Sequence, residues 1–168
     1  NKDYKKESMF IADILSKYGV KTVLDAGCGT GTHMQLLEKQ GFLCTGLDLS
    51  KDMLEVASKK VKGLLFEGDI TNFSLSYKFN AIICMFAVFN HIIDRGKAIK
   101  ALKRFIRHLN PGGIIILDLH NPLDNGKKDD IINNIKRVMN WNYDEHSKIE
   151  ETTISYYIGN KIIKDYHL

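Results

Sequence analysis

The sequence predicts an α/β fold in which a doubly wound, mostly parallel sheet has helices on both faces and is followed by a C-terminal antiparallel β-meander. From residue 8 to residue 119, short apolar runs alternate with segments of helical period, which is typical of parallel strands joined by right-handed crossovers. After Pro122 the segments become alternating or β-branched, as in antiparallel strands. At 168 residues and 44% hydrophobic side chains, the chain is expected to form one domain, with its core over residues 8–119 and the meander over residues 136–168.

Residues that start and stop helices set the order of the elements. Gly19 and Gly41 end the first two helices, and Ser50 is a good N-cap for the third. The Asn-Pro-Gly-Gly sequence at residues 110–113 is expected to break the fourth helix, and residues 124–130 are expected to form a flexible loop. The helices are expected over residues 8–18, 30–40, 51–61 and 94–109, and the strands over a run ending at Leu24 and over residues 42–47, 64–66, 80–86, 114–119, 137–143, 149–157 and 161–166.

Two of these elements indicate how the sheet is covered. The run over residues 80–86 is almost entirely apolar, which suits a central strand covered on both faces. The fourth helix is amphipathic, and its basic side is expected to face solvent rather than RNA. Its apolar side, expected to face the core, consists of Ile99, Leu102, Phe105, Ile106 and Leu109.

A glycine-rich turn, VLDAGCGTGTH at residues 23–33, joins the first strand to the second helix. Gly27, Gly29 and Gly31 allow positive φ and a close approach of a ligand to the backbone, and amides at the helix start can receive a negatively charged group. The dinucleotide fingerprint G-x-G-x-x-G is not met, because Thr32 stands where its third glycine would fall. Such turns also occur without a ligand, so a nucleotide-cofactor site needs support from the following strands.

The next two strands end in acidic residues that suit a nucleoside. Asp48 can accept hydrogen bonds from both hydroxyls of a ribose, or can serve as a helix cap. Leu49 and Met53 can flank an adenine with apolar surface. In the Gly68-Asp69-Ile70 stretch, an acid beside a free backbone amide can bind the amino group and a ring nitrogen of the adenine, with a plain turn as the alternative.

In order and spacing, these motifs resemble those of the class I S-adenosylmethionine (SAM)-dependent methyltransferases, whose first motif is hydrophobic, hydrophobic, acid, x, Gly, x, Gly, x, Gly. GLDLS with Met53, EGDI, MFAVFNH and LNPGG follow in the family's order, and the resemblance covers residues 17–119. FNAIICMFAVFNHI and DLHNP are most similar to small-molecule methyltransferases of the glycine or amino-sugar N-methyltransferase type. The resemblance implies a Rossmann-like fold and an enzyme that moves the methyl group of S-adenosyl-L-methionine to a small-molecule acceptor at nitrogen, leaving S-adenosyl-L-homocysteine (SAH).

The resemblance also assigns cofactor-binding positions. The acid of the first motif acts on the α-amino group of the cofactor, and the residues after the fourth strand border its methionine part. The positions implied are Asp25, Ala26, Gly27, Cys28, Gly29, Thr30, Gly31, Asp48, Leu49, Met53, Gly68, Asp69, Ile70, Met85 and Phe86.

Methyl transfer from a sulfonium is an in-line displacement, so the protein mainly aligns the reactants and needs few catalytic side chains. An amine acceptor must lose a proton, which a histidine can accept. His91 and His120 follow the fourth and fifth strands and are the candidate catalytic residues, with a polar contact to the acceptor as the favoured role. His33 either borders the cofactor pocket or is an ordinary first-turn residue, and no metal site is expected.

Composition narrows the partners and the compartment. The net charge of +4 is spread without a long basic stripe, and the chain has neither an (Asn/Asp)-Pro-Pro-aromatic tetrapeptide nor a Pro-Cys pair, so nucleic acid is not an expected substrate. Cys28, Cys44 and Cys84 are an odd number without C-x-x-C spacing, which fits free thiols in the cytoplasm. The longest apolar stretch, residues 81–89, is too short to cross a membrane.

Two other functions share the same motifs. An NAD(P)-dependent oxidoreductase would use the same turn and acids, and a non-catalytic partner or scaffold subunit would keep the SAM fold without methyl transfer.

Members of the family continue past the meander into another helix and two strands, so the resemblance implies that the chain is truncated at its C-terminus. A homodimer is a further expectation, since an unpaired sheet edge needs a cover.

Overall fold

The computed structural model describes residues 3–119, 126–132, 135–147, 149–159 and 161–167. Contacts between Cα atoms divide the chain into two compact units, Asn1–Leu119 and His120–Leu168. The expectation that the whole chain is one domain stays a prediction, and each unit is described by itself.

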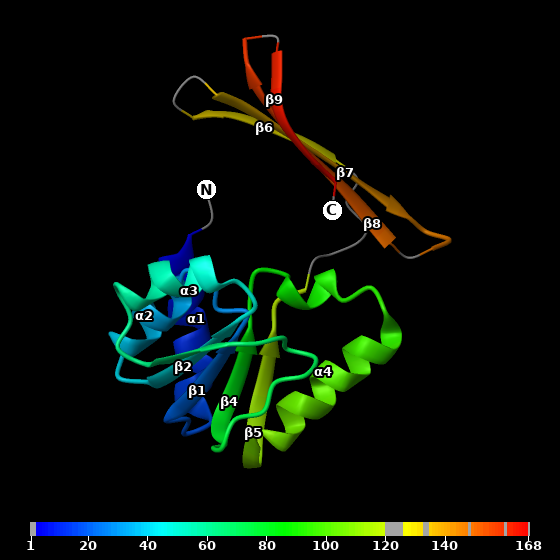
Figure 1. Cartoon of the computed structure of the whole chain (residues 1–168). Helices are drawn as coiled ribbons and strands as arrows, with labels where there is room; N and C mark the ends of the chain where they lie inside the picture. The colour runs from blue at the N-terminus through cyan, green and yellow to red at the C-terminus, as the bar shows by residue number, and fades with distance from the viewer. Residues whose placement is uncertain (1–2, 120–125, 133–134, 148, 160, 168) are drawn as a thin grey trace. The chain divides into compact units, whose positions relative to one another are not determined.

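The first unit is the predicted doubly wound sheet. Its five strands are parallel and lie in the order β3-β2-β1-β4-β5. The order of strands along the sheet reverses between β1 and β4, which lie side by side in Figure 1. The strands are β1 (Thr22–Ala26), β2 (Leu43–Asp48), β3 (Leu64–Glu67), β4 (Phe79–Cys84) and β5 (Leu109–Leu117), and the helices are α1 (Tyr4–Lys17), α2 (Thr32–Glu38), α3 (Lys51–Ser58), the 3-10 helix η1 (Val88–His91) and α4 (Arg95–Arg107).

Each face of the sheet has its own hydrophobic core, because successive side chains of a strand point to opposite sides. Val23 and Ile83 pack with Leu15 of α1 in one core. Leu24, on the other side of β1, packs with Phe105 of α4. All five side chains are fully buried, which explains why the central strands are apolar at nearly every position.

The fourth helix begins and ends close to the predicted residues, but part of its predicted apolar side is wrong. Ala101 and Phe105 face the sheet and are fully buried, whereas the side chains of Ile99 and Ile106 are 43% and 62% exposed. At 3.6 residues per turn, these two isoleucines lie about a third of a turn away from the buried side. The helix therefore uses only part of its apolar stripe for the described core.

The Asn-Pro-Gly-Gly stretch does not separate α4 from the fifth strand in the way the sequence predicts. The strand β5 already begins at Leu109, directly after the helix. Its pairing with β4 jumps from Phe79↔Leu109 to Ala81↔Ile114, so residues 110–113 form a bulge within the strand. Gly112 takes a φ of +77°, which allows the chain to turn back into the ladder.

The second unit is the predicted antiparallel meander, with one strand more than expected. It consists of β6 (Gly126–Ile132), β7 (Ile135–Asp144), β8 (Ile149–Ile158) and β9 (Lys161–His167), in the order β6-β7-β8-β9. The prediction of a flexible loop over residues 124–130 is wrong for residues 126–130, which lie in β6, while residues 124 and 125 lie outside the described residues.

Charge pairing explains the strand that the sequence analysis missed. Its GKKDDII sequence has few residues of high strand propensity. However, Asp130 lies opposite Arg137 and receives a hydrogen bond from its Nε at 3.0 Å, and Lys136 Nζ lies 3.1 Å from Asp129 Oδ2. Cross-strand pairs of opposite charge stabilise an antiparallel ladder, and this pairing becomes visible only when both strands are in register.

Candidate functional site

Acidic side chains of the first unit come together at the carboxyl ends of β1, β2 and β3. Asp25 is the fourth residue of β1, Asp48 ends β2, and Asp69 follows β3 by two residues. Parallel strands place these ends at one edge of the sheet, next to the reversal of strand order, where open α/β sheets bind ligands.

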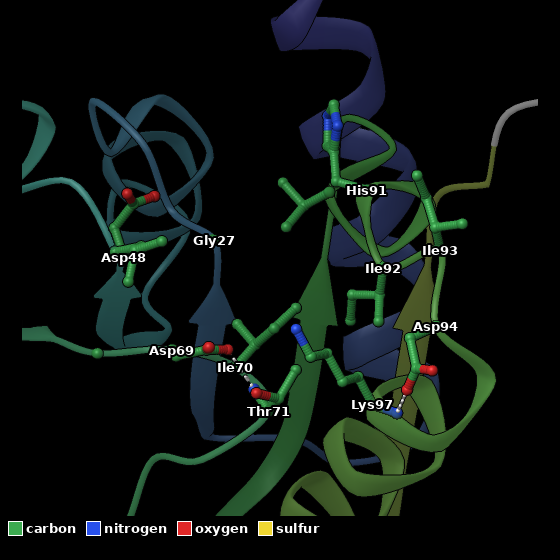
Figure 2. A pocket seen from close by; sticks show the side chains of 13 residues that line it. Gly27, Asp48, Asp69, Ile70, Thr71, His91, Ile92, Ile93, Asp94 and Lys97 are labelled. Carbon is green, nitrogen blue, oxygen red and sulfur yellow. Dashed lines mark hydrogen bonds between the residues drawn. The ribbon is translucent and has the colours of Figure 1, made fainter. Parts of the chain in front are cut away.

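A cavity of about 640 Å³ lies at this edge (Figure 2). Seven of the predicted site residues line it, namely Gly27, Asp48, Leu49, Gly68, Asp69, Ile70 and His91. The sequence analysis missed six further lining residues, namely Thr71, Val88, Ile92, Ile93, Asp94 and Lys97. In Figure 2 the side chain of Lys97 extends from the start of α4 toward the segment that carries Ile70 and Thr71.

The glycine turn uses its amides inside the protein. The amides of Gly27 and Cys28 both donate to the carbonyl oxygen of Leu47, at 2.7 and 3.0 Å, and that of Gly31 donates to Cys28 at 2.9 Å. The amide of Gly29 donates to Asp48 Oδ2 at 2.7 Å. These four amides therefore donate to acceptors within the protein. The expectation that amides at the helix start receive a negatively charged group concerns the first residues of α2 and stays a prediction. The turn also continues two residues further than predicted, since α2 begins at Thr32.

Asp48 ties the glycine turn to the end of β2. Its Oδ2 accepts a hydrogen bond from the amide of Gly29, and its Oδ1 accepts one from the amide of Ser50 at 2.8 Å. The helix-cap alternative is wrong, because α3 is capped by the Ser50 hydroxyl, which accepts from the Met53 amide at 3.3 Å. A carboxylate has about four acceptor positions, so two remain for a ligand in the cavity that Asp48 lines.

Asp25 is the most unusual group of the site. Its side chain is 1% exposed, and its Oδ2 accepts no hydrogen bond from the residues that the structure describes. Burial, together with the nearby negative charge of Asp48, raises the pKa of Asp25 to about 7. A buried polar atom without a partner is costly and persists where it serves a function.

The Asp69 segment is both a turn and a cavity wall. Asp69 Oδ1 accepts a hydrogen bond from the amide of Thr71 at 2.7 Å, as in a turn. The same residues also line the cavity, so the turn does not exclude a binding role, which stays a prediction. Hydrogen bonds join the residues after Asp69 to the last turn and the C-cap of α4. Arg104 Nη2 donates to Asn72 Oδ1 at 2.9 Å, and the amide of Leu75 donates to Nε2 of His108 at 2.9 Å.

Several predicted site residues do not line the cavity. Met85 is buried, Met53 is 45% exposed, and Phe86 is 60% exposed beside the ring of Tyr4. His33 is buried and its Nε2 lies 2.6 Å from Oε2 of Glu7, so it belongs to the packing of α2 on α1. Also absent from the cavity wall are Asp25, Ala26, Cys28, Gly29, Thr30 and Gly31, although Asp25 and Gly29 are linked to it through Asp48. His120 lies outside the described residues.

Replacing Gly27 by alanine is expected to lower the free energy of unfolding by about 2 kcal/mol. Gly27 has a φ of +82°, and an added Cβ would lie 2.6 Å from Cγ1 of Val88. Gly19 is a matched control, because it also has a positive φ, +64°, but has nothing within 4 Å of its added Cβ. Chemical denaturation should show a loss of about 1 kcal/mol for Gly19→Ala, and equal losses in both variants would contradict the close contact with Val88.

Open α/β sheets with an acid and a glycine turn at the carboxyl edge form a broad class of ligand-binding proteins. The family of this chain follows from a comparison with known families. Residues 23–113 match the model described as "Methyltransferase domain". The chain belongs to this methyltransferase family.

Relatives and solved structures agree with this assignment. A curated relative, the dTDP-3-amino-3,6-dideoxy-alpha-D-glucopyranose N,N-dimethyltransferase of Streptomyces fradiae, is 34% identical over 120 residues, covering 70% of this chain and 47% of that protein. The crystal structure of a SAM-dependent methyltransferase from Clostridium acetobutylicum superposes with a TM-score of 0.82 and 26% identity, covering 100% of this chain and 73% of that one.

A more distant structure shows the same fold. The SAM-bound amino pentose methyltransferase of Micromonospora echinaspora has a TM-score of 0.84 and 23% identity, covering 100% of this chain and 75% of that one. The two structural matches cover the whole of this chain, including the meander. The chain spans about half the length of the curated relatives it matches.

Proposed function

We propose that this chain binds S-adenosyl-L-methionine at the carboxyl edge of its parallel sheet and belongs to an enzyme that transfers the methyl group to nitrogen of a small molecule. One observation carries the proposal: the buried Oδ2 of Asp25, which accepts no hydrogen bond from the described residues, lies beside Asp48 and next to the glycine turn. An ammonium group is the partner that such an oxygen lacks, and the methionine part of SAM carries one.

The other acids suit the nucleoside part of the same molecule. Asp48 keeps two acceptor positions for the ribose hydroxyls while it holds the amides of Gly29 and Ser50. Asp69 and the backbone of Ile70 lie on the cavity wall, where they can bind the edge of an adenine. When bound, SAM supplies an electrophilic methyl group on a sulfonium, so the residues of this chain need only hold and orient it.

The glycine turn favours SAM over a dinucleotide. A pyrophosphate is bound by free amides at the start of a helix. Here the amides of Gly27, Cys28, Gly29 and Gly31 already donate to acceptors within the protein. These four amides are therefore not available to a pyrophosphate at the turn, which favours a cofactor without phosphate there.

The acceptor amine must lose a proton, and His91 is the described residue that can take it. It ends the 3-10 helix η1, is exposed, and is among the residues that line the cavity (Figure 2). The names of the relatives suggest the acceptor class, since they methylate amino sugars linked to dTDP, or glycine. Amines of these two kinds are the acceptors that we propose to test first.

The proposed compartment is the cytoplasm. Cys28, Cys44 and Cys84 are all free and buried, and burial raises the pKa of each thiol, as expected for inert thiols in a reducing environment. No helix in the described part of the chain is long and apolar enough to cross a membrane.

Isothermal titration calorimetry with SAH and with NAD⁺ tests the cofactor. SAH is expected to bind with one site per chain, and NAD⁺ is expected to give no heat of binding. Binding of NAD⁺ without SAH would overturn the proposal in favour of an oxidoreductase. Transfer of a tritiated methyl group from SAM to dTDP-linked amino sugars or to glycine, measured with the full-length gene product, separates an enzyme from a non-catalytic SAM-binding subunit.

A further inference from the structure

The turn that follows β4 is held in a strained conformation. Phe86 and Ala87 have φ values of +61° and +53°, and they are the only residues other than glycine with positive φ in the described part of the chain. The left-handed region is unfavourable for residues with a Cβ, and two such residues in succession persist only where their surroundings enforce the conformation. Strained residues of this kind cluster at functional sites, where neighbouring groups hold the backbone in the unfavourable conformation.

Asp118 restrains this turn through hydrogen bonds on both sides of Met85. Its amide donates to the carbonyl oxygen of Cys84 at 3.0 Å, which continues the pairing of β5 with β4. Its side chain reaches one step further, and Oδ2 accepts the amide of Phe86 at 3.0 Å. Because the acceptor is a carboxylate, this hydrogen bond is stronger than one between neutral groups. The backbone and the side chain of Asp118 are thus hydrogen-bonded to Cys84 and Phe86, on the two sides of Met85, where the chain leaves the sheet.

The strained turn decides where the next element lies. The 3-10 helix η1 begins at Val88, immediately after Ala87, and both Val88 and His91 line the cavity. Val88 is so close to the glycine turn that a Cβ added to Gly27 would lie 2.6 Å from its Cγ1. Any relaxation of Phe86 and Ala87 to ordinary φ values would redirect the chain and withdraw Val88 from Gly27.

We propose that Asp118 is a positioning residue, which holds the Phe86-Ala87 turn in its left-handed conformation so that Val88 and His91 form a wall of the ligand cavity. Asp118 does not line the cavity itself and acts through the turn. As far as it concerns cofactor affinity, the inference rests on the proposed binding of SAM and SAH.

The test compares Asp118→Ala, Asp118→Asn, Ala87→Gly and the double variant Asp118→Ala/Ala87→Gly by calorimetry with SAH. Asp118→Ala is expected to raise the Kd about tenfold, because the freed turn must be strained again on binding. Asp118→Asn keeps an acceptor oxygen and is expected to raise the Kd only about threefold. Glycine adopts positive φ without strain, so Ala87→Gly in the Asp118→Ala background should restore the Kd to within about threefold of wild type.

Glu38→Ala is the matched control. Glu38 also joins a side-chain carboxylate to distant backbone amides, those of Lys62 and Gly63, at 2.9 and 2.7 Å, but it does so before β3, at the opposite edge of the sheet. This variant should lower the melting temperature and leave the Kd for SAH within about twofold of wild type. A merely structural role of Asp118 predicts the same behaviour for Asp118→Ala, without rescue by Ala87→Gly.

An NMR measurement keeps this inference separate from the proposed function. The three-bond coupling between the amide and α protons, together with the Cα and Cβ shifts of Ala87, reports its φ in the absence of any cofactor. A positive φ in wild type that is lost in Asp118→Ala supports the restraint even if SAH fails to bind, in which case the proposed function fails alone. An unchanged φ of Ala87 in Asp118→Ala would overturn the inference. If wild type binds SAH, a Kd of Asp118→Ala equal to that of wild type would overturn it as well.

Discussion

Asp48→Ala is expected to weaken binding of SAH about 100-fold, because the carboxylate combines two tasks in one side chain. It holds the amides of Gly29 and Ser50, at 2.7 and 2.8 Å, and so fixes the glycine turn against the end of β2. Asp48 lines the cavity and keeps two further acceptor positions, to which the proposed ribose hydroxyls would donate. Removal of the carboxylate loses both hydroxyl contacts and also frees the turn that shapes the site. Calorimetry with SAH measures the change directly.

Asp52→Ala is the matched control for this variant. Asp52 lies in the first turn of α3, only four residues away, and is exposed. Its replacement removes the same unit of negative charge from the same region but no described contact with the cavity, so the affinity for SAH should stay within about twofold of wild type. Equal effects of the two substitutions would show that the charge of the region, and not the position of the Asp48 carboxylate, determines affinity.

Asp25→Asn is expected to remove most of the affinity for SAH at pH 8 and to abolish its dependence on pH. The pKa of Asp25 is raised to about 7, so the carboxyl group is largely protonated at pH 5 and largely ionised at pH 8. An ammonium group binds the ionised form, and the affinity of wild type should therefore rise by roughly 90-fold between these pH values. Asparagine has the same shape without the titrating proton. Calorimetry at several pH values, in buffers of different ionisation enthalpy, also measures the proton that wild type releases on binding below pH 7.

The same substitution is expected to have the opposite effect on the stability of the free protein. The pKa of Asp25 rises from 3.8 to about 7 on folding, so the folded state binds more protons than the unfolded state between these values. The free energy of unfolding of wild type should therefore fall as the pH rises from about 4 to about 7. Asp25→Asn should lack this loss and be more stable than wild type at pH 8 without cofactor. A wild-type unfolding free energy that does not change across this window would contradict the assigned pKa.

The parallel sheet was predictable because its signals are local. Apolar runs such as that over residues 80–86 require burial on both faces, and residues such as Gly41 and Ser50 mark where helices stop and start. The strand β6 was not predictable in this way. Its charged residues become compatible with a ladder only when Asp130 meets Arg137 and Asp129 meets Lys136. The bulge at residues 110–113 likewise depends on the register of β5 against β4.

The residues of the candidate site likewise differ in how far the sequence predicts them. Asp48 and Asp69 could be placed in it from the sequence, because acids at the ends of parallel strands meet at one edge of the sheet. Val88 and Lys97 could not, because nothing in the residues after β4 indicates that the chain turns back over the glycine turn. That path depends on the left-handed Phe86 and Ala87, and neither residue type predicts a positive φ.

By itself, the sequence of this protein determined the order of the parallel strands and the four α-helices, the glycine turn with Asp25 before it, and the acids at the ends of β2 and β3. These features depend on residue type and spacing along the chain. Only the tertiary structure decided that four amides of the turn donate within the protein, that Asp25 is buried with an oxygen that accepts no hydrogen bond from the described residues, and that Asp118 restrains the chain beside the cavity. The reason is physical: desolvation, strain and hydrogen-bond satisfaction depend on groups from distant parts of the chain, which the spacing of residues does not specify.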